Sequence, residues 1–64
     1  MEHTTGLDLK VERVRAKLSL NEVVAEMGVS RTTVWTIEKA PEVKPETAQA
    51  YRDAIARLSE KAAA

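Results

Sequence analysis

Apolar residues recur along this chain at helical spacing, in four separate runs. In the first run, four aliphatic side chains step by four, three and four residues: Leu7, Val11, Val14 and Leu18. This spacing is typical of one face of an amphipathic α-helix. Asp8 is the expected N-cap of that helix, and residues 1–6 are expected to form a loose arm ahead of it.

The second run begins at a serine. Ser19 is followed three residues later by Glu22, which predicts a capping box in which each side chain accepts the backbone N–H of the other residue. The apolar stripe of this helix consists of Leu20, Val23, Val24 and Met27. Gly28 is expected to end the helix at a positive φ, which glycine adopts without steric cost.

The third run separates two faces of one short helix. Ser30 is its expected N-cap, and Val29 and Val34 occupy hydrophobic-staple positions on either side of that cap. At 100° per residue, Val34 and Ile37 point inward. The outward face carries Arg31 on its flank, then Thr32, Trp35, Thr36 and Lys39.

The fourth run follows a short proline-containing loop. Pro41 is expected to stop the third helix, and Pro45 suits the first position of the fourth. The apolar stripe of the fourth helix consists of Ala48, Tyr51, Ile55 and Leu58, and residues 61–64 are expected to fray. No strand pattern appears, so the sequence predicts an all-α fold, with one four-helix domain over residues 7–60.

The composition of the chain excludes several kinds of functional site. The 64 residues include no cysteine, so neither a disulfide framework nor a thiolate metal site is available. His3 is the single histidine and cannot form a metal cluster alone, and none of the serines Ser19, Ser30 and Ser59 has a nearby His/Asp constellation. We therefore expect no metal, no cofactor and no catalytic residue.

The charge and hydropathy of the chain bear on its partners. Ten basic and ten acidic side chains give a net charge of zero, whereas nucleic-acid-binding domains usually carry a basic excess. No run approaches the roughly 18 apolar residues of a membrane span, and the N-terminus lacks the layout of a signal peptide. A cytoplasmic location with no membrane contact is the expectation.

The stretch from Leu18 to Lys39 resembles the helix-turn-helix proteins of the phage repressor and Cro type, often called the Xre family. The resemblance extends over about residues 7–58. It depends most on the Leu-Ser opening at Leu18, the Gly-Val-Ser turn at residues 28–30, and Glu38 after Ile37. It implies a lambda-repressor-like fold and sequence-specific binding to double-stranded DNA, by a homodimer on a palindromic operator, in a small transcriptional regulator of a phage or mobile element.

The resemblance also assigns expected roles to individual residues. An arginine of the first helix pairs with the glutamate that closes the recognition helix in this family, and Arg13 and Glu38 occupy those positions. The base-reading positions of the family correspond here to Arg31, Thr32, Trp35 and Thr36. The DNA-backbone contacts correspond to Ser19, Asn21, Ser30, Lys39 and Lys44.

The expected position of Trp35 on the outer face is compatible with more than one function. A tryptophan on an outer helix face offers a large apolar area to water, so a partner is expected. It could lie against DNA, enter a protein interface, or fold over Arg31, Lys39 or the loop at residues 40–45. Because the chain is neutral and Leu20 stands where the family usually has a polar residue, a protein-interaction module such as an anti-repressor or antitoxin-like partner is the alternative function.

Overall fold

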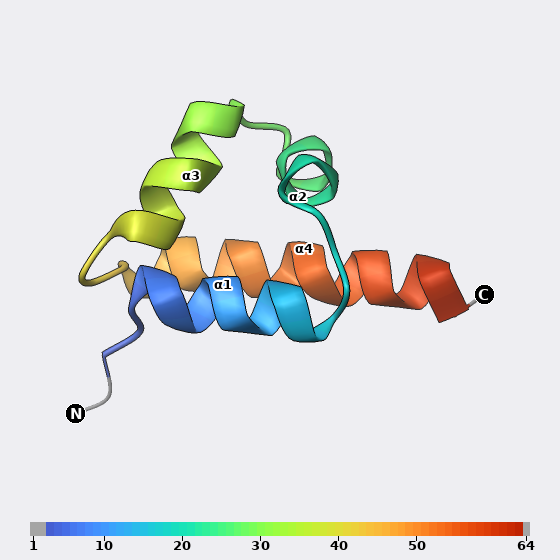
Figure 1. Ribbon diagram of the computed structural model, residues 1–64, viewed down its shortest axis with the longest axis horizontal. Coiled ribbons are helices and arrows are strands. Elements are labelled where there is room, and N and C mark those ends of the chain that lie inside the picture. The colour runs from blue at the N-terminus through green and yellow to red at the C-terminus, as the bar shows by residue number, and fades with distance from the viewer. Residues whose placement is uncertain (1–2, 64) are drawn as a thin grey trace.

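The computed structural model describes residues 3–63, which form four helices and no strand. The helices are α1 (Gly6–Arg15), α2 (Leu20–Met27), α3 (Arg31–Lys39) and α4 (Pro45–Ala63) (Figure 1). The fold is therefore all-α with four helices, as predicted. No helix within residues 3–63 is long and apolar enough to cross a lipid bilayer.

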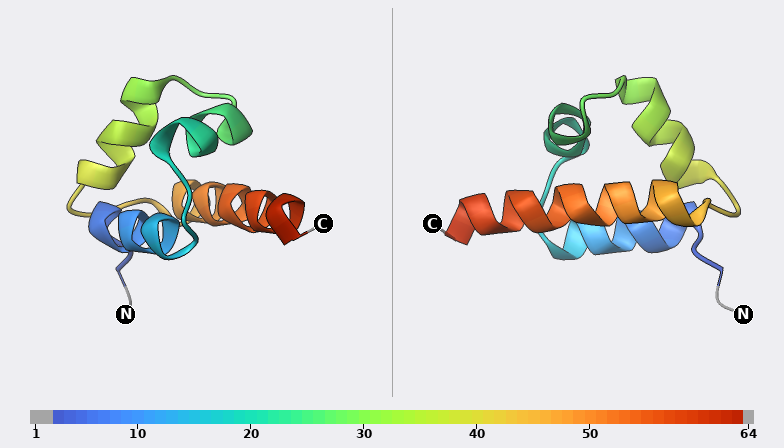
Figure 2. Two further views of the ribbon diagram at one scale, coloured as in Figure 1. Left: turned by 45° about the vertical axis from the view of Figure 1, so that its right-hand side comes forward. Right: turned by 180° about the vertical axis from the view of Figure 1, so that it is seen from behind.

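The helices form two layers. Helices α1 and α4 lie side by side, with α2 and α3 above them (Figures 1 and 2). Helix α3 packs against α1 and α2, whereas α2 also packs against α4. The buried core between the layers consists of Leu9, Val23, Val34, Val43, Ala48 and Tyr51. Every helix therefore contributes to one shared core.

The predicted ends of α2 and α3 are present. Ser19 and Glu22 form the capping box, with the Ser19 Oγ accepting the Glu22 N–H at 3.1 Å and Glu22 Oε1 accepting the Ser19 N–H at 2.9 Å. Gly28 ends α2 at φ 70°. Ser30 caps α3 by accepting the Thr33 N–H at 3.1 Å. The capping box thus fixes the start of α2, and Gly28 and Ser30 fix the turn between α2 and α3.

The start of α1 differs from the prediction. Thr5, not Asp8, is the N-cap: its Oγ1 accepts the Asp8 N–H at 3.1 Å, and Asp8 Oδ2 accepts the Thr5 N–H at 3.0 Å. Asp8 is thus the third residue of the helix.

The expected loose arm is also wrong for residues 4–6. Gly6 N donates to Ala40 O at 2.9 Å, and Val43 N donates to Thr4 O at 2.8 Å. These two hydrogen bonds hold residues 4–6 against the loop between α3 and α4.

The predicted apolar stripe of α1 is on the wrong side. Leu7, Val11 and Val14 are 63%, 39% and 57% exposed, and only Leu18, which lies beyond the end of the helix, is buried. Leu9, on the opposite side of α1, is fully buried. The hydrophobic pattern did not reveal the inner face because its other members, Gly6 and the largely buried Arg13, are not apolar.

Two smaller expectations also differ from the structure. Helix α4 continues to Ala63 instead of fraying from residue 61, and Lys61 is held by Glu26 of α2 at 2.8 Å. Ala64 lies outside the described residues. Val29 and Val34 were predicted to form a hydrophobic staple at the start of α3. Val34 is buried in the core, but Val29 is 37% exposed.

Candidate nucleic-acid interface

The inner face of α3 is attached to the rest of the domain through Glu38. Arg13 of α1 donates from Nε to Glu38 Oε2 at 2.8 Å and from Nη2 to Glu38 Oε1 at 3.3 Å. Arg13 also donates from Nη1 to the Leu18 carbonyl at 3.0 Å. The two side chains are only 13% and 7% exposed, so the expected ion pair is present and largely shielded from water.

Tyr51 of α4 is the third member of this cluster. Its hydroxyl donates to Glu38 Oε2, which leaves both carboxylate oxygens of Glu38 occupied. The hydrogen bond that Arg13 donates to Glu38 raises the pKa of Arg13. Burial, followed by the hydrogen bond that Tyr51 donates to Glu38, raises the pKa of Tyr51 well above its usual range. One carboxylate thus links α3 to both helices of the lower layer. The apolar spacing of α4 placed Tyr51 in the core, but it did not indicate this polar role.

Gly6 brings α1 and α3 into close contact. A Cβ atom at this position would lie 2.2 Å from the carbonyl oxygen of Ile37 and 2.5 Å from the carbonyl carbon of Glu38. This role was not predicted: Gly6 was expected to be the last residue of the N-terminal arm. The available signal was the spacing of Gly6, Leu9 and Arg13, at i, i+3 and i+7, which places all three on one face of a helix.

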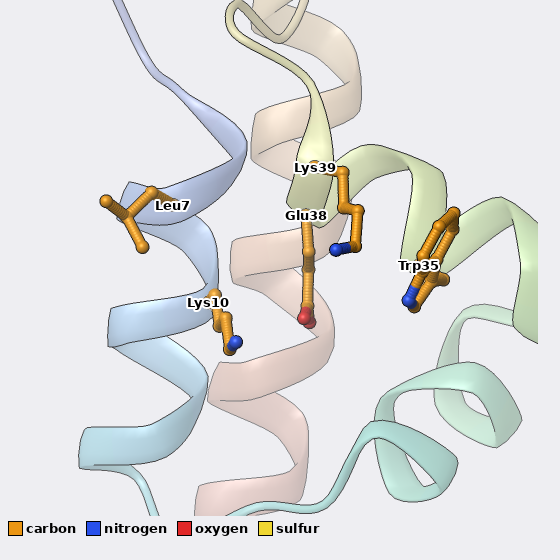
Figure 3. Close-up of a pocket in the computed structure, with 5 residues that line it drawn as sticks. All are labelled: Leu7, Lys10, Trp35, Glu38 and Lys39. Atoms are coloured by element: carbon orange, nitrogen blue, oxygen red, sulfur yellow. The ribbon is translucent and has the colours of Figure 1, made fainter.

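The outer face of α3 is open along its length. All five residues expected there are exposed: Arg31, Thr32, Trp35, Thr36 and Lys39. Trp35 is 52% exposed, although the Lys39 ammonium lies 4.7 Å from the centroid of its ring (Figure 3). Of the alternatives for Trp35, the contact with Lys39 is therefore present, and about half of the side chain remains available to a partner.

A shallow hollow joins α2 to this outer face. It is lined by Leu20 at the start of α2 and by Arg31, Thr32 and Trp35 of α3. The exposed residues Ser19 and Asn21 flank Leu20 in the chain, so the N-terminus of α2 lies beside the first two turns of α3. The structure thus brings part of the expected backbone-contact set together with the expected base-contact set.

A second hollow joins α1 to the same outer face. It is lined by Leu7 and Lys10 of α1 and by Trp35, Glu38 and Lys39 of α3 (Figure 3). Lys10 thus adds a cation beside the candidate interface. It was not among the expected contact residues, because helical spacing alone places it only on a charged edge of α1.

The remaining expected backbone contacts are less clearly grouped. Lys44 is exposed immediately before α4, and no described contact connects it to the outer face of α3. The Ser30 hydroxyl is used within α3, where it accepts from the Thr33 backbone and bonds the Thr33 hydroxyl at 2.8 Å. Ser30 is therefore first a structural cap.

The charges of this neutral chain are unevenly distributed. Three of the basic residues paired with carboxylates belong to α4: Arg52, Arg57 and Lys61. Within residues 3–63, the basic residues without an ion pair lie elsewhere, on α1, α3 and the connecting segments: Lys10, Arg15, Lys17, Arg31, Lys39 and Lys44. Three of these cations, Lys10, Arg31 and Lys39, line the two hollows at the outer face of α3.

Comparisons with protein-family models, curated proteins and solved structures found no match to this chain. Among residues 3–63 there is also no group of three or more side chains that could hold a metal ion.

Proposed function

We propose that this protein binds double-stranded DNA sequence-specifically by inserting the outer face of α3 into the major groove. The observation that carries the proposal is the asymmetry of α3: its inner face is held by Arg13 and Tyr51, while its outer face is open beside the N-terminus of α2. A major groove about 12 Å wide admits one helix. The neighbouring helix N-terminus is then suited to the phosphate backbone.

The outer-face side chains supply the chemistry that base recognition needs. The Arg31 guanidinium fits guanine O6 and N7, and the threonines Thr32 and Thr36 can bond base edges or contact a thymine methyl. Trp35 offers apolar area to sugars and methyl groups. Lys39, together with Ser19 and Asn21, would contact phosphates, with Lys44 and the Ser30 region at the margin of the contact.

The charge distribution supports this proposal despite the zero net charge. The ion pairs of α4 neutralise its cations, whereas Lys10, Arg31 and Lys39 stay unpaired around the outer face. Phosphate binding releases condensed counterions, so even a few such cations favour binding at low salt. We place the protein in the cytoplasm, as a small phage-type or mobile-element-type regulator that acts as a dimer on a palindromic operator.

Selection from a pool of random duplexes tests the proposal. We expect one sequence to be enriched at low salt, with an affinity that falls steeply as salt is raised. On the selected duplex, Arg31→Ala should weaken binding by about 1–3 kcal/mol and relax the preference at one base pair. Lys39→Ala should instead weaken binding to all sequences about equally and reduce the salt dependence. Enrichment of no sequence would contradict the proposal.

A protein-interaction module remains the second candidate, because the hollow beside α3 combines Leu20 with the half-exposed Trp35. Such a module would retain a protein partner that is lost on Trp35→Ala, while no duplex is enriched. An anti-repressor or antitoxin-like partner would fit this result. Retention of the same partner by the Trp35→Ala variant would exclude the outer face as its binding surface.

A further inference from the structure

The exposed side of α1 carries an apolar stripe that no other helix covers. Leu7, Val11 and Val14 follow one another at i, i+4 and i+7 and are 63%, 39% and 57% exposed. Helix α1 packs against α3 and α4 through its other sides. Three aligned aliphatic side chains in water are unfavourable for a monomer, since apolar area gains free energy when it is removed from water.

The charges beside the stripe differ between its two edges. At 100° per residue, Lys10 lies on the edge nearer α3, where it lines the hollow with Trp35 (Figure 3). Asp8 and Arg15 lie on the other edge, toward Glu12, which binds Arg52 of α4. Arg15 has no ion pair within residues 3–63, and one carboxylate oxygen of Asp8 is not used by the α1 cap.

We propose that this stripe is a homodimer interface, in which α1 packs antiparallel against α1 of a second copy about a two-fold axis at Val11. In this pairing Leu7 lies opposite Val14 of the second copy, and Val11 meets itself. Asp8 lies opposite Arg15 of the second copy, and the contact occurs twice. The stripe and its charged edge are therefore complementary to a second copy of themselves, as a two-fold interface requires.

The same axis places the two α3 helices suitably for one duplex. A two-fold axis perpendicular to both α1 helices leaves each edge of the stripe beside the same edge of the second copy. Because the α3 edge of one copy meets the α3 edge of the other, both Trp35 faces lie on one side of the dimer. The choice of a second copy as occupant thus also rests on the proposed binding to DNA.

The position of Lys10 predicts how strong this dimer is. The two Lys10 side chains approach each other near the axis, on the side that would face DNA, so they repel when no phosphate is present. Three aliphatic side chains per copy also form a short contact compared with the 20–30 residues a side of a standard interface (about 800 Å² per partner). We therefore expect weak association in free solution and stronger association on a duplex.

Single cysteines test the pairing without DNA, since the native chain has none. Val11→Cys should form a disulfide-linked dimer under mild oxidation much faster than Ala50→Cys, a matched control on the exposed side of α4. Leu7→Cys alone should link slowly. Antiparallel pairing separates the two copies of this cysteine by about 12 Å along the helix axes, which is beyond the reach of a disulfide. A mixture of Leu7→Cys and Val14→Cys should link quickly to each other.

Equal linking rates for Val11→Cys and Ala50→Cys would overturn the dimer, and fast linking of Leu7→Cys alone would overturn its antiparallel register. On a selected palindrome, Val11→Asp should lower affinity about 5- to 150-fold while leaving half-site affinity unchanged. Circular dichroism checks that this variant is folded. Selective linking at Val11→Cys with no enriched duplex would support the dimer and contradict the DNA proposal, so the two failures are distinguishable.

Discussion

The two faces of α3 differ in how completely their polar groups are partnered. On the inner face, both oxygens of Glu38 are occupied by Arg13 and Tyr51, and Gly6 lets α1 lie against the backbone. On the outer face, Arg31, Thr32 and Thr36 are exposed, and the Lys39 ammonium lies over part of the Trp35 ring. A nine-residue helix is thus rigidly held from one side and left unoccupied on the other.

The difference follows from the cost of burying charge. A buried carboxylate without partners is strongly unfavourable, so the inner face needs every hydrogen bond that it has. Exposed polar side chains form hydrogen bonds with water and need no partner within the protein. Substitutions should therefore separate the two faces: inner-face changes should lower the free energy of unfolding, and outer-face changes should lower binding.

The largest effect is expected for Glu38→Gln. The substitution keeps the shape of the side chain but leaves the Arg13 guanidinium largely buried without a counterion, which should cost about 3–5 kcal/mol of unfolding free energy. Urea denaturation followed by circular dichroism measures this loss. Glu46→Gln, at an exposed position in the first turn of α4, is the control and should cost only the interaction with the helix dipole, about 0.3–1 kcal/mol. Equal effects would mean that the Glu38 cluster does not hold α3.

The second largest loss of stability is expected for Gly6→Ala. The new methyl group would overlap the carbonyl oxygen of Ile37, so α1 and α3 would have to move apart. Overpacking of this kind costs about 1–3 kcal/mol. Alanine is otherwise the better helix former, so the control Ser59→Ala on exposed α4 should be neutral or slightly stabilising. A stabilised Gly6→Ala variant would show that the close contact is not required.

A smaller effect is expected for Tyr51→Phe, with a distinct pH dependence. Loss of the hydrogen bond to Glu38 should cost about 1–2 kcal/mol at neutral pH. The pKa of Tyr51 is raised by folding, so its stabilising contribution is complete below the ordinary tyrosine pKa of about 10 and is lost as the pH rises above it. The difference in unfolding free energy between the wild type and Tyr51→Phe should therefore shrink as unfolding is measured at increasingly alkaline pH. A constant difference would contradict the buried hydroxyl.

The smallest effect on stability is expected at Trp35. Trp35→Ala removes an exposed contact with Lys39, which is worth at most about 0.5–1 kcal/mol. Binding to the selected duplex should nevertheless fall sharply, because the ring is the largest open apolar group of the outer face. Thermal unfolding and a binding titration on the same sample separate the two quantities. Unfolding of the domain by Trp35→Ala would place Trp35 with the inner face instead.

The predictions from sequence were accurate where structure depends on neighbours in the chain. The capping box at Ser19, the positive φ of Gly28 and the start of α4 at Pro45 involve groups within four residues of each other. The side of α1 that is buried was predicted wrongly, because the conspicuous apolar stripe containing Val11 is exposed. The stripe has the spacing of a core face, and nothing in the local sequence distinguishes a core face from an exposed apolar one.

The sequence by itself determined the four helices, the N-caps of α2 and α3 and the turn between these two helices, since these depend on short-range hydrogen bonds and steric preferences. It also determined which side chains share the outer face of α3, because helical periodicity fixes that arrangement. Only the tertiary structure decided that Gly6 must lack a side chain, that Leu9 replaces Leu7 in the core, and that Glu38 binds Tyr51. Each of these depends on atoms brought together from distant parts of the chain, where the available space and the need to partner buried charge select among faces that the local pattern leaves equivalent.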